Sequence, residues 1–446
     1  MTEGYPRVLV IDVVPFNRYQ NTGILKSSLF EGWPKECLRQ ILYAHLRPGF
    51  DVCENNWQLN KTDVLKALLG SGPNRRLLPE AARGGLLNPE RTLEYTSRPR
   101  VEEALRWLSP QIRIPLGEAI LRLPGVLSPR LRAWIEEFQP EAIYSITATA
   151  AMLRLVTKVA EWRSIPIVPH FTDDWISWLN RGDIFGWWLR PSLLYWFQRC
   201  LDRSPVRLVV SRRMAVEYAN RYGGSFAMFT NPQDMPLDRP LCALKPSGWP
   251  VKLVFVGGLR PGRGKTLRSV AQAVSAARRA GVACELDVYS FPDELQDCQE
   301  DLANNDGVRV MGWAMPGDIP GILQSADVLV HVESFEKGAI EKTWLSFSTK
   351  LTSYLSAAKP ILVCGPPALA SCDMVAGSGC GICVSEDSVE AISAAVRSLC
   401  TDAELRARLG ERSWRVAKSE FEAGAVRERF RQTLCRVAGA HNDCQG

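Results

Sequence analysis

Histidine is scarce in this chain, and cysteine shows no regular pattern. Only four histidines occur among 446 residues, and the CxxC pair Cys380 and Cys383 has no second pair, so a zinc site is poorly supported. The thirteen cysteines are odd in number and scattered, which favours reduced thiols over a disulfide framework. We therefore expect buried structural cysteines, no bound metal and no cofactor.

The sequence also lacks a long apolar run. Residues 175–197 are the most apolar region, but Arg181, Asp183, Arg190 and Pro191 interrupt it before it reaches the roughly 20 residues of a membrane span. The apolar segment 7–14 carries an aspartate and has no small-residue cleavage site, so a secretory signal is not expected. These absences predict a cytoplasmic protein.

Length and composition predict two globular domains. The chain is 46% hydrophobic and 23% charged, and 446 residues exceed what one hydrophobic core usually supports. Five prolines lie between Asn231 and Pro250, which is typical of a linker. We predict a first domain at 1–235, a linker at 236–250, a second domain at 251–418, and a C-terminal helix and tail at 419–446. The amphipathic stretch Phe421–Val437 is expected to pack back on the first domain.

Short apolar runs alternate with helical patterns in both halves. In the second half we predict strands at 251–256, 285–289, 308–311, 327–332, 360–364 and 381–384, with a helix at 266–280. In the first half we predict strands at 7–14, 142–146, 165–170 and 206–210, with helices at 149–163 and 212–222. Such alternation with buried strands predicts an α/β fold of two Rossmann-like, doubly wound parallel sheets, with a cleft between the domains.

Positive charge is concentrated in one stretch. Eleven arginines and six glutamates lie between Arg75 and Arg132, with neither lysine nor aspartate, so 11 − 6 = +5 of the chain's net +6 falls there. We interpret 71–130 as an irregular insertion in the first domain. Such a stretch suits an anionic partner such as a membrane surface or a lipid pyrophosphate, and a solvated basic face is the alternative.

A glycine-rich basic loop follows the strand predicted at 251–256. Gly257 and Gly258 allow close approach of a ligand to the backbone, and Arg260, Arg263 and Lys265 add positive charge before a helix N-terminus. This combination suits a diphosphate. A Walker A loop is disfavoured because five residues, not four, separate Gly258 from Gly264. A purely structural turn is the other alternative.

From this loop onward the sequence resembles the group 1, or family 4, glycosyltransferases. The similar passages are the glycine loop, Ser325–Val330 (SADVLV), Ser348–Val363 (STKLTSYLSAAKPILV) beside the family's "PSKLxEYLAxGKPVL", and Gly381–Val384. In the first half, the passage from Val210 to Pro232 and the glycine at Gly23, after the first strand, are also similar. The resemblance covers most of the chain and implies the two-domain GT-B architecture.

The resemblance also implies a chemistry. Such enzymes bind a nucleotide diphosphate-sugar mainly in the second domain and transfer the sugar, with retention and without a divalent metal, to an acceptor held by the first. Cationic side chains stabilise the departing diphosphate. The implied donor-binding residues are Gly23, Gly257, Gly258, Arg260, Arg263, Lys265, Glu333, Ser348, Thr349 and Lys350.

The chain departs from the family at two positions. Gly258 stands at the family's phosphate-loop arginine, so Arg260 or Lys265 would have to substitute for it. Ser353 stands at the second glutamate of the family's EX7E element, and Glu333, Glu336 and Glu341 are candidates for the first.

A second candidate site follows the strand predicted at 165–170. His170, Asp173 and Asp174 could orient an acceptor hydroxyl or bind the sugar, and we predict them as catalytic residues. The alternative is structural, with Asp174 capping the next helix and His170 filling the strand end.

The partners and the activity leave alternatives open. Tryptophans beside arginines in 175–200 suit either a membrane interface, reached together with the Arg-rich stretch 75–132, or buried helix packing. We predict a nucleotide-sugar donor and a glycan or lipid-linked acceptor, with no nucleic acid partner. A sugar-nucleotide epimerase of the same fold and a non-catalytic nucleotide- or glycan-binding protein are the alternative functions.

Overall fold

The computed structural model describes residues 4–18, 21–42, 49–59, 75–77, 116, 124–179, 186–236 and 249–443. The chain divides into two compact units. Unit 1 comprises Met1–Phe229 and Arg427–Gly446, and unit 2 comprises Thr230–Val426. Most of the predicted insertion (71–130) and most of the predicted linker (236–250) lie outside the described residues.

Unit 1 contains a sheet of eight strands in its described part, in the order β4-β3-β2-β1-β5-β6-β7-β8. All neighbours pair in parallel except β3 and β4, which are antiparallel. The strands are β1 (Val8–Asp12), β2 (Leu38–Leu42), β3 (Asn56–Gln58), β4 (Arg75–Leu77), β5 (Ala142–Ser145), β6 (Ile167–Phe171), β7 (Arg207–Val209) and β8 (Phe226–Met228).

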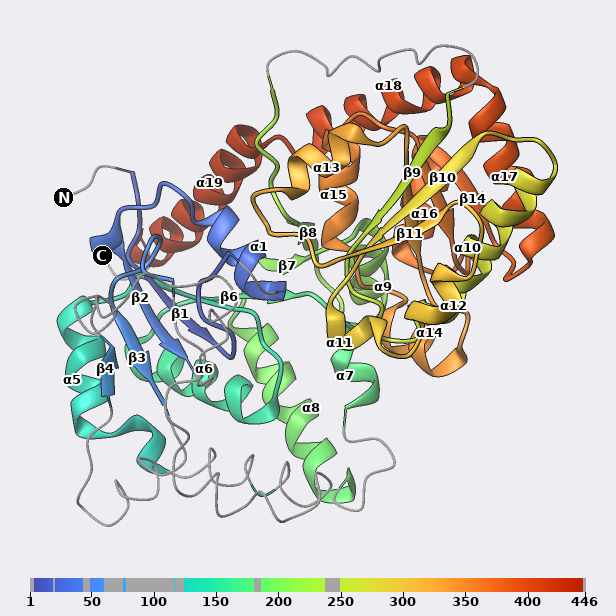
Figure 1. Cartoon of the computed structure of the whole chain (residues 1–446). Helices are drawn as coiled ribbons and strands as arrows, with labels where there is room; N and C mark the ends of the chain where they lie inside the picture. The colour runs from blue at the N-terminus through green and yellow to red at the C-terminus, as the bar shows by residue number, and fades with distance from the viewer. Residues whose placement is uncertain are drawn as a thin grey trace. The chain divides into compact units, whose positions relative to one another are not determined.

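Helices with clear sequence signals flank this sheet (Figure 1). They are α1 (Asn21–Leu29), α5 (Pro129–Phe138), α6 (Ala150–Arg163), α7 (Trp175–Trp178), α8 (Gly186–Asp202) and α9 (Arg212–Tyr222), with short 3-10 turns η1 (Lys35–Cys37) and η4 (Pro124–Leu127). The hydroxyl of Thr149 accepts the amide of Met152 at the start of α6, and Ser211 caps α9 in the same way. Side-chain caps of this kind fix where a helix begins.

Unit 2 contains a six-stranded parallel sheet in the order β11-β10-β9-β12-β13-β14. Its strands are β9 (Val251–Val256), β10 (Cys284–Tyr289), β11 (Val308–Gly312), β12 (Val328–Val332), β13 (Ile361–Cys364) and β14 (Gly381–Val384). The strand order reverses between β9 and β12, and open α/β sheets bind ligands at such a switch point, beyond the carboxyl ends of the strands.

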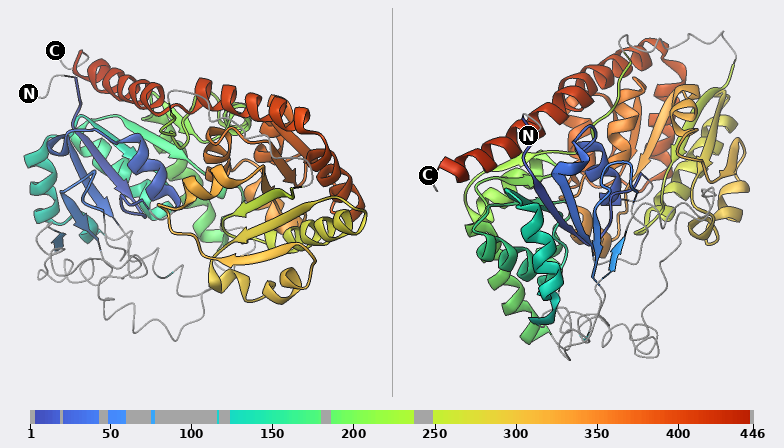
Figure 2. Two further views of the ribbon diagram at one scale, coloured as in Figure 1. Left: turned by 45° about the horizontal axis from the view of Figure 1, so that its top comes forward. Right: turned by 90° about the vertical axis from the view of Figure 1, so that its left-hand side faces the viewer.

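The helices of unit 2 cover the sheet (Figure 2). They are α10 (Arg263–Arg279), α11 (Pro292–Leu295), α12 (Gln299–Ala303), α13 (Ile319–Ser325), α14 (Lys337–Thr343), α15 (Thr349–Ser356), α16 (Ala370–Ser378), α17 (Val389–Thr401) and α18 (Ala403–Glu420). Leu267, Val270 and Val274 of α10 share a buried core with Phe255 and with Ile392 of α17. Their spacing gives α10 the apolar stripe of an amphipathic helix.

Helix α19 (Ala423–Asp443) begins in unit 2, and its residues from Arg427 onward belong to unit 1. In unit 1 its fully buried Phe430 contacts the rings of Phe30, Tyr144 and Phe229 edge-on. The C-terminal helix therefore contributes to the aromatic core of unit 1. Among the described residues, no helix combines the length and apolarity needed to cross a membrane.

Candidate functional site

The glycine-rich loop joins β9 to α10 at the switch point of unit 2. Helix α10 begins at Arg263, three residues before the predicted start at Thr266, because Gly262 takes a left-handed conformation (φ 69°) at the N-cap. A Cβ on Gly262 would lie 2.5 Å from Oγ of Ser334. Arg263 therefore lies in the first turn of the helix, beside the residues that follow β12.

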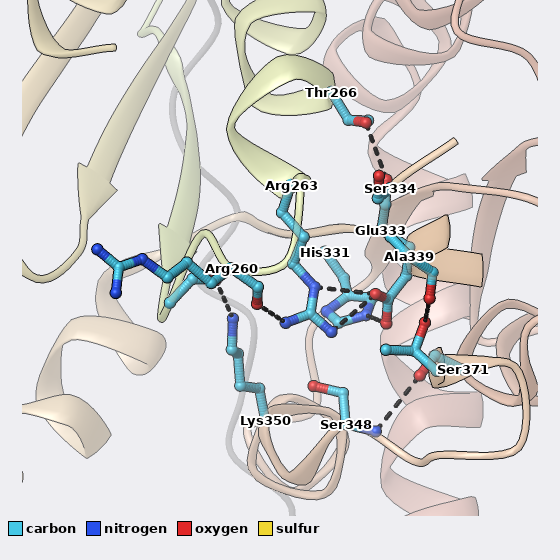
Figure 3. Close-up of polar contacts among 12 residues, drawn as sticks. Arg260, Arg263, Thr266, His331, Glu333, Ser334, Ala339, Ser348, Lys350 and Ser371 are labelled. Carbon is cyan, nitrogen blue, oxygen red and sulfur yellow. Dashed lines mark hydrogen bonds and ion pairs between the residues drawn. The ribbon is translucent and has the colours of Figure 1, made fainter. Parts of the chain in front are cut away.

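Arg263 forms a buried ion pair with Glu333, the residue directly after β12 (Figure 3). Nε and Nη2 of Arg263 lie 2.9 Å and 2.8 Å from Oε2 of Glu333. Nε2 of the buried His331 lies 2.9 Å from the other carboxylate oxygen. Burial would raise the pKa of Glu333, but Arg263 and His331 lower it to about 2. Glu333 is therefore an ionised anchor for Arg263 rather than a free acid.

This anchor leaves part of the Arg263 guanidinium available. Nη1 donates to the backbone oxygen of Arg260 at 2.8 Å, and Nε and Nη2 donate to Glu333. A guanidinium carries five N–H groups in one plane, so these three bonds leave two N–H groups without a partner in the described part of the chain, and they could bind an anion. Thr266 donates its hydroxyl to the backbone oxygen of Glu333 at 2.8 Å, which fixes the helix against the strand end.

Lys350 points toward the same loop from the first turn of α15 (Figure 3). Its Nζ donates to the backbone oxygen of Gly258 at 3.2 Å and lies 5.0 Å from the ring centroid of Phe255. Burial, together with the nearby Arg263, lowers the pKa of Lys350 to about 7. An anion bound beside it would favour the charged form and raise that pKa.

Gly257 makes room for Lys350. Its φ of 140° lies outside the range that side chains favour, and a Cβ there would lie 2.2 Å from both Cε and Nζ of Lys350. Gly258 accepts the Lys350 hydrogen bond through its carbonyl oxygen. The two glycines therefore bring the loop backbone against a cationic side chain.

The other predicted donor residues of unit 2 differ in placement. Ser348 is the N-cap residue of α15, and its amide donates to Oγ of Ser371 at 3.3 Å, while Thr349 is exposed. Lys265 is exposed on α10. The side chain of Arg260 is 70% exposed and lies 3.6 Å from Asp293, and its backbone oxygen, rather than its guanidinium, contacts Arg263. Arg260 and Lys265 are therefore surface cations near Arg263 and Lys350, which are partly buried.

Two exposed aromatic residues that were not predicted from the sequence also lie at this edge of the sheet. Phe291 follows β10 and Trp313 follows β11, and their rings stack with centroids 6.4 Å apart and planes 26° apart. Their exposed fractions are 42% and 37%. The signal in the sequence was an aromatic residue one or two positions after each of two neighbouring strands.

His331 was also missed, although its spacing carried a signal. Residues two apart on a strand point to the same face, which places His331 beside Glu333 at the end of β12. Burial lowers the pKa of His331, so the neutral ring donates its Nε2–H to Glu333. Nδ1 has no hydrogen-bond partner among the described residues.

The predicted catalytic residues of unit 1 lie in a different environment. His170, in β6, is fully buried, with Nδ1 2.7 Å from the hydroxyl of Tyr144 and Nε2 3.0 Å from the backbone oxygen of Phe229. Burial lowers the pKa of His170 to about 4. Both ring nitrogens are occupied inside the core, which supports the structural alternative for His170.

Asp174 and Asp173 are adjacent but differ in burial. Asp174 is fully buried and accepts hydrogen bonds from Tyr218, Ser177 and Arg221. It stands at the N-cap of α7, although its side chain makes no capping bond there. Asp173 is exposed, and its side chain lies 3.4 Å from the hydroxyl of Thr172. Of the predicted catalytic group, Asp173 is the one whose side chain reaches the surface.

The structure places Gly23 in a helix, not in the loop expected from the resemblance, and its role in donor binding stays a prediction. Gly23 lies in the first turn of α1 in unit 1, where a Cβ would lie 2.0 Å from Nδ2 of Asn17. The glycine therefore allows α1 to pack on the segment after β1. The other predicted donor residues belong to unit 2.

Comparisons with known proteins agree with this arrangement. Residues 250–402 match the family model "Glycosyl transferases group 1". HepE from Anabaena, solved in complex with UDP, has 12% identity and a TM-score of 0.61, over 96% of this chain and 99% of that one. Sucrose-phosphate synthase from Thermosynechococcus elongatus has 11% identity and a TM-score of 0.61, over 97% and 100%.

A third solved structure is WaaG, described as a glycosyltransferase involved in lipopolysaccharide biosynthesis. It has 13% identity and a TM-score of 0.54, over 96% of this chain and 99% of that one. A search of curated proteins finds no match. The fold likeness spans both units, and the family match falls on the unit that contains Arg263, Glu333 and Lys350. The resemblance seen in the sequence is thus confirmed: residues 250–402 match the group 1 glycosyltransferase family, and the chain has the two-domain GT-B fold of these solved glycosyltransferase structures.

Proposed function

We propose that the protein transfers a glycosyl group from a nucleoside diphosphate-sugar bound in unit 2 to an acceptor hydroxyl in glycan or glycoconjugate assembly. The observation that carries this proposal is the cationic pair Arg263 and Lys350 beside the glycine loop at the switch point. Arg263 has two unused N–H groups, and Lys350 has a pKa of about 7. Both suit the diphosphate of a donor.

The chemistry follows from charge. The bond between the sugar C1 and the diphosphate oxygen breaks, a bond from C1 to the acceptor oxygen forms, and the proton of the acceptor hydroxyl passes to the departing diphosphate. Negative charge grows on the leaving diphosphate, and positioned cations stabilise it more in the transition state than in the ground state. Arg263, fixed by Glu333, and Lys350 would supply this stabilisation without a metal. We propose retention of configuration, and the anomeric NMR signal of the product tests it.

Uridine is the first nucleoside to test. HepE was solved with UDP and also with UDP-glucose. In this chain, the stacked rings of Phe291 and Trp313 lie at the sheet edge of unit 2 that also carries the glycine loop. An exposed aromatic face stacks on a planar base and is worth roughly 1–3 kcal/mol by alanine substitution. The pair is therefore our candidate for the base-binding surface.

We propose a glycan or lipid-linked acceptor, held by unit 1, with Asp173 as the carboxylate that contacts it. Helix α8 exposes Trp187 (79%), Tyr195 (55%) and Leu194 (41%). Residues at these spacings share one face of a helix, and tryptophan and tyrosine favour a membrane interface. This face supports peripheral membrane contact of a cytoplasmic enzyme. Arg181 and most of the Arg-rich stretch 75–132 lie outside the described residues.

Titration calorimetry of the full chain with UDP, GDP and ADP tests the donor site. We expect one of them to bind, and Arg263→Ala to weaken that binding by roughly 10²-fold, since a charged hydrogen-bond partner of phosphate contributes about 1.5–3 kcal/mol. Arg268→Ala is the matched control, because Arg268 lies on the same helix and pairs with Asp301 at 3.4 Å. Its affinity should stay within about twofold.

Two outcomes would count against the proposal. If no nucleoside diphosphate binds, unit 2 is not a donor site. If a nucleotide binds but the nucleotide-sugar is neither hydrolysed nor transferred across a panel of acceptors, the non-catalytic alternative is favoured.

A further inference from the structure

Gln233 joins two segments that are far apart in the sequence. Its amide donates to the backbone oxygen of Phe421 at 2.7 Å, and its backbone oxygen accepts the amide of Ala423 at 3.0 Å. Gln233 and Glu422 thus form an isolated parallel bridge within unit 2. The bridge ties together residues 230–236, which follow the boundary from unit 1, and residues 421–426, which precede the return to it. We call these two the connecting segments.

The side chain of Gln233 binds a third element, helix α15. Its Nε2 donates to Oγ1 of Thr352 at 2.9 Å, and its Oε1 accepts the hydroxyl of Ser353 at 3.1 Å. Thr352 in turn donates to the backbone oxygen of Thr349 at 2.9 Å. Both backbone groups and both side-chain groups of Gln233 therefore have partners, and all of these partners lie in unit 2.

Helix α15 is also the helix that carries Lys350 in its first turn. The first turn of α15 therefore carries a cation of the candidate donor site, and Thr352 and Ser353 of the same helix bind the side chain of Gln233. The stacked rings of Phe347 and Phe421, with centroids 6.2 Å apart, form a second contact between the start of α15 and a connecting segment. A fully satisfied polar network is cooperative and rigidifies the elements that it joins.

We propose that Gln233 is a positioning residue that couples occupation of the donor site, through α15, to the two connecting segments. Ser353 is the link on the helix: where the family has a glutamate, this chain has a hydroxyl that holds Gln233. The coupling is reciprocal. A ligand that stabilises one arrangement of α15 also stabilises the matching arrangement of the connecting segments, and that arrangement of the segments in turn favours the ligand. The nucleotide part of this inference rests on the proposed function.

Hydrogen–deuterium exchange of the full chain tests the link, first without nucleotide. Ser353→Ala removes one hydrogen bond to the side chain of Gln233 and leaves the backbone bridge between the two connecting segments in place. We expect exchange at the amides of Gln233 and Ala423 to become about fivefold faster, the ratio that corresponds to one net hydrogen bond. Ser356→Ala is the matched control, because its hydroxyl donates to the backbone oxygen of Ser353, at 2.9 Å, and not to Gln233. Unchanged exchange in Ser353→Ala overturns the inference.

The second measurement adds UDP. In the wild-type chain we expect UDP to slow exchange both in the first turn of α15 and in the connecting segments. Gln233→Met keeps the backbone bridge and the side-chain length but removes both side-chain bonds. In this variant UDP should still bind within about twofold and protect α15, and it should no longer protect the connecting segments. Protection that persists there overturns the coupling.

The two measurements separate the two proposals. If UDP, GDP and ADP all fail to bind the wild-type chain while Ser353→Ala still speeds exchange at Ala423, the donor site is wrong and the Gln233 link stands. If UDP binds and Ser353→Ala changes nothing, the donor site stands and the link is overturned.

Discussion

The two units place charged residues after their strands, but with different outcomes. In unit 1, Asp174 follows β6 and is enclosed by Tyr218, Ser177 and Arg221. In unit 2, Glu333 follows β12 and holds Arg263, whose guanidinium keeps unused N–H groups at the sheet edge. Asp174 is enclosed by its hydrogen-bond partners, whereas Glu333 orients the guanidinium of Arg263. The two carboxylates therefore differ in what surrounds them: Asp174 is enclosed by side chains of unit 1, whereas Glu333 holds the guanidinium of Arg263 beside the glycine-rich loop of unit 2.

The largest expected effect is the loss of the carboxylate in unit 2. Glu333→Ala leaves Arg263 and His331 buried without their partner, which costs about 3 kcal/mol of unfolding free energy. Exchange of the β12 core amides measures this for unit 2 alone. Glu336→Ala, at an exposed position, should change it by less than about 0.5 kcal/mol. Equal effects of the two variants would break the comparison.

The lowered pKa of Glu333 also predicts how the stability of unit 2 depends on pH. Because the pKa of Glu333 is lowered to about 2, its stabilisation is complete above its ordinary value and is lost as the pH falls through 2.

A second large effect is expected at His170. The unfolded chain binds a proton near pH 6.5, while the buried ring resists it until about pH 4. Stability of unit 1 should therefore be highest above pH 6.5 and fall by about 3 kcal/mol as the pH drops to 4. His170→Gln keeps donor and acceptor groups but does not titrate, so its exchange-derived stability should depend less on pH. A pH dependence identical to wild type would contradict the structural role.

A smaller effect is expected at Lys350. In the free protein its pKa is about 7, so the ammonium loses its proton as the pH rises, and binding of a diphosphate must restore it. UDP affinity of the wild type should therefore fall by about tenfold between pH 6.5 and 8.5 relative to Lys350→Arg, whose guanidinium stays charged. Lys265→Arg, at an exposed position, serves as the control and should follow the wild-type profile. Parallel profiles for wild type and Lys350→Arg would remove Lys350 from the donor site.

The smallest effect on stability is expected at Asp173, which sharpens the comparison within unit 1. Asp174→Asn should lower the stability of unit 1 by about 2 kcal/mol, because Arg221 loses its buried counter-charge. Asp173→Asn should change it by less than about 0.5 kcal/mol, and under the proposed role it should still slow transfer to the acceptor. If Asp173→Asn transferred the sugar at the wild-type rate, Asp173 would have no role in acceptor binding.

Much of the fold could be predicted because local patterns agree with the tertiary structure. The strands β9, β12 and β14 fall within one residue of the predicted bounds, and helix α9 matches Arg212–Tyr222. Their continuous apolar runs and side-chain caps act over a few residues. The short strands β2, β3 and β8 were missed, because β2 and β3 contain polar side chains and the three residues of β8 are too few to show a period.

The sequence by itself determined the parallel sheet of unit 2, the glycine loop and the cationic residues around it, because chain order and strand pattern place loops at the carboxyl edge of a sheet. Only the tertiary structure decided which of those residues pair. His170 could be a catalytic group or a core residue until its burial and both of its partners were known. Burial and hydrogen-bond partners depend on residues distant in sequence, such as Glu333 for Arg263 and Gln233 for Ser353, and no local pattern encodes them.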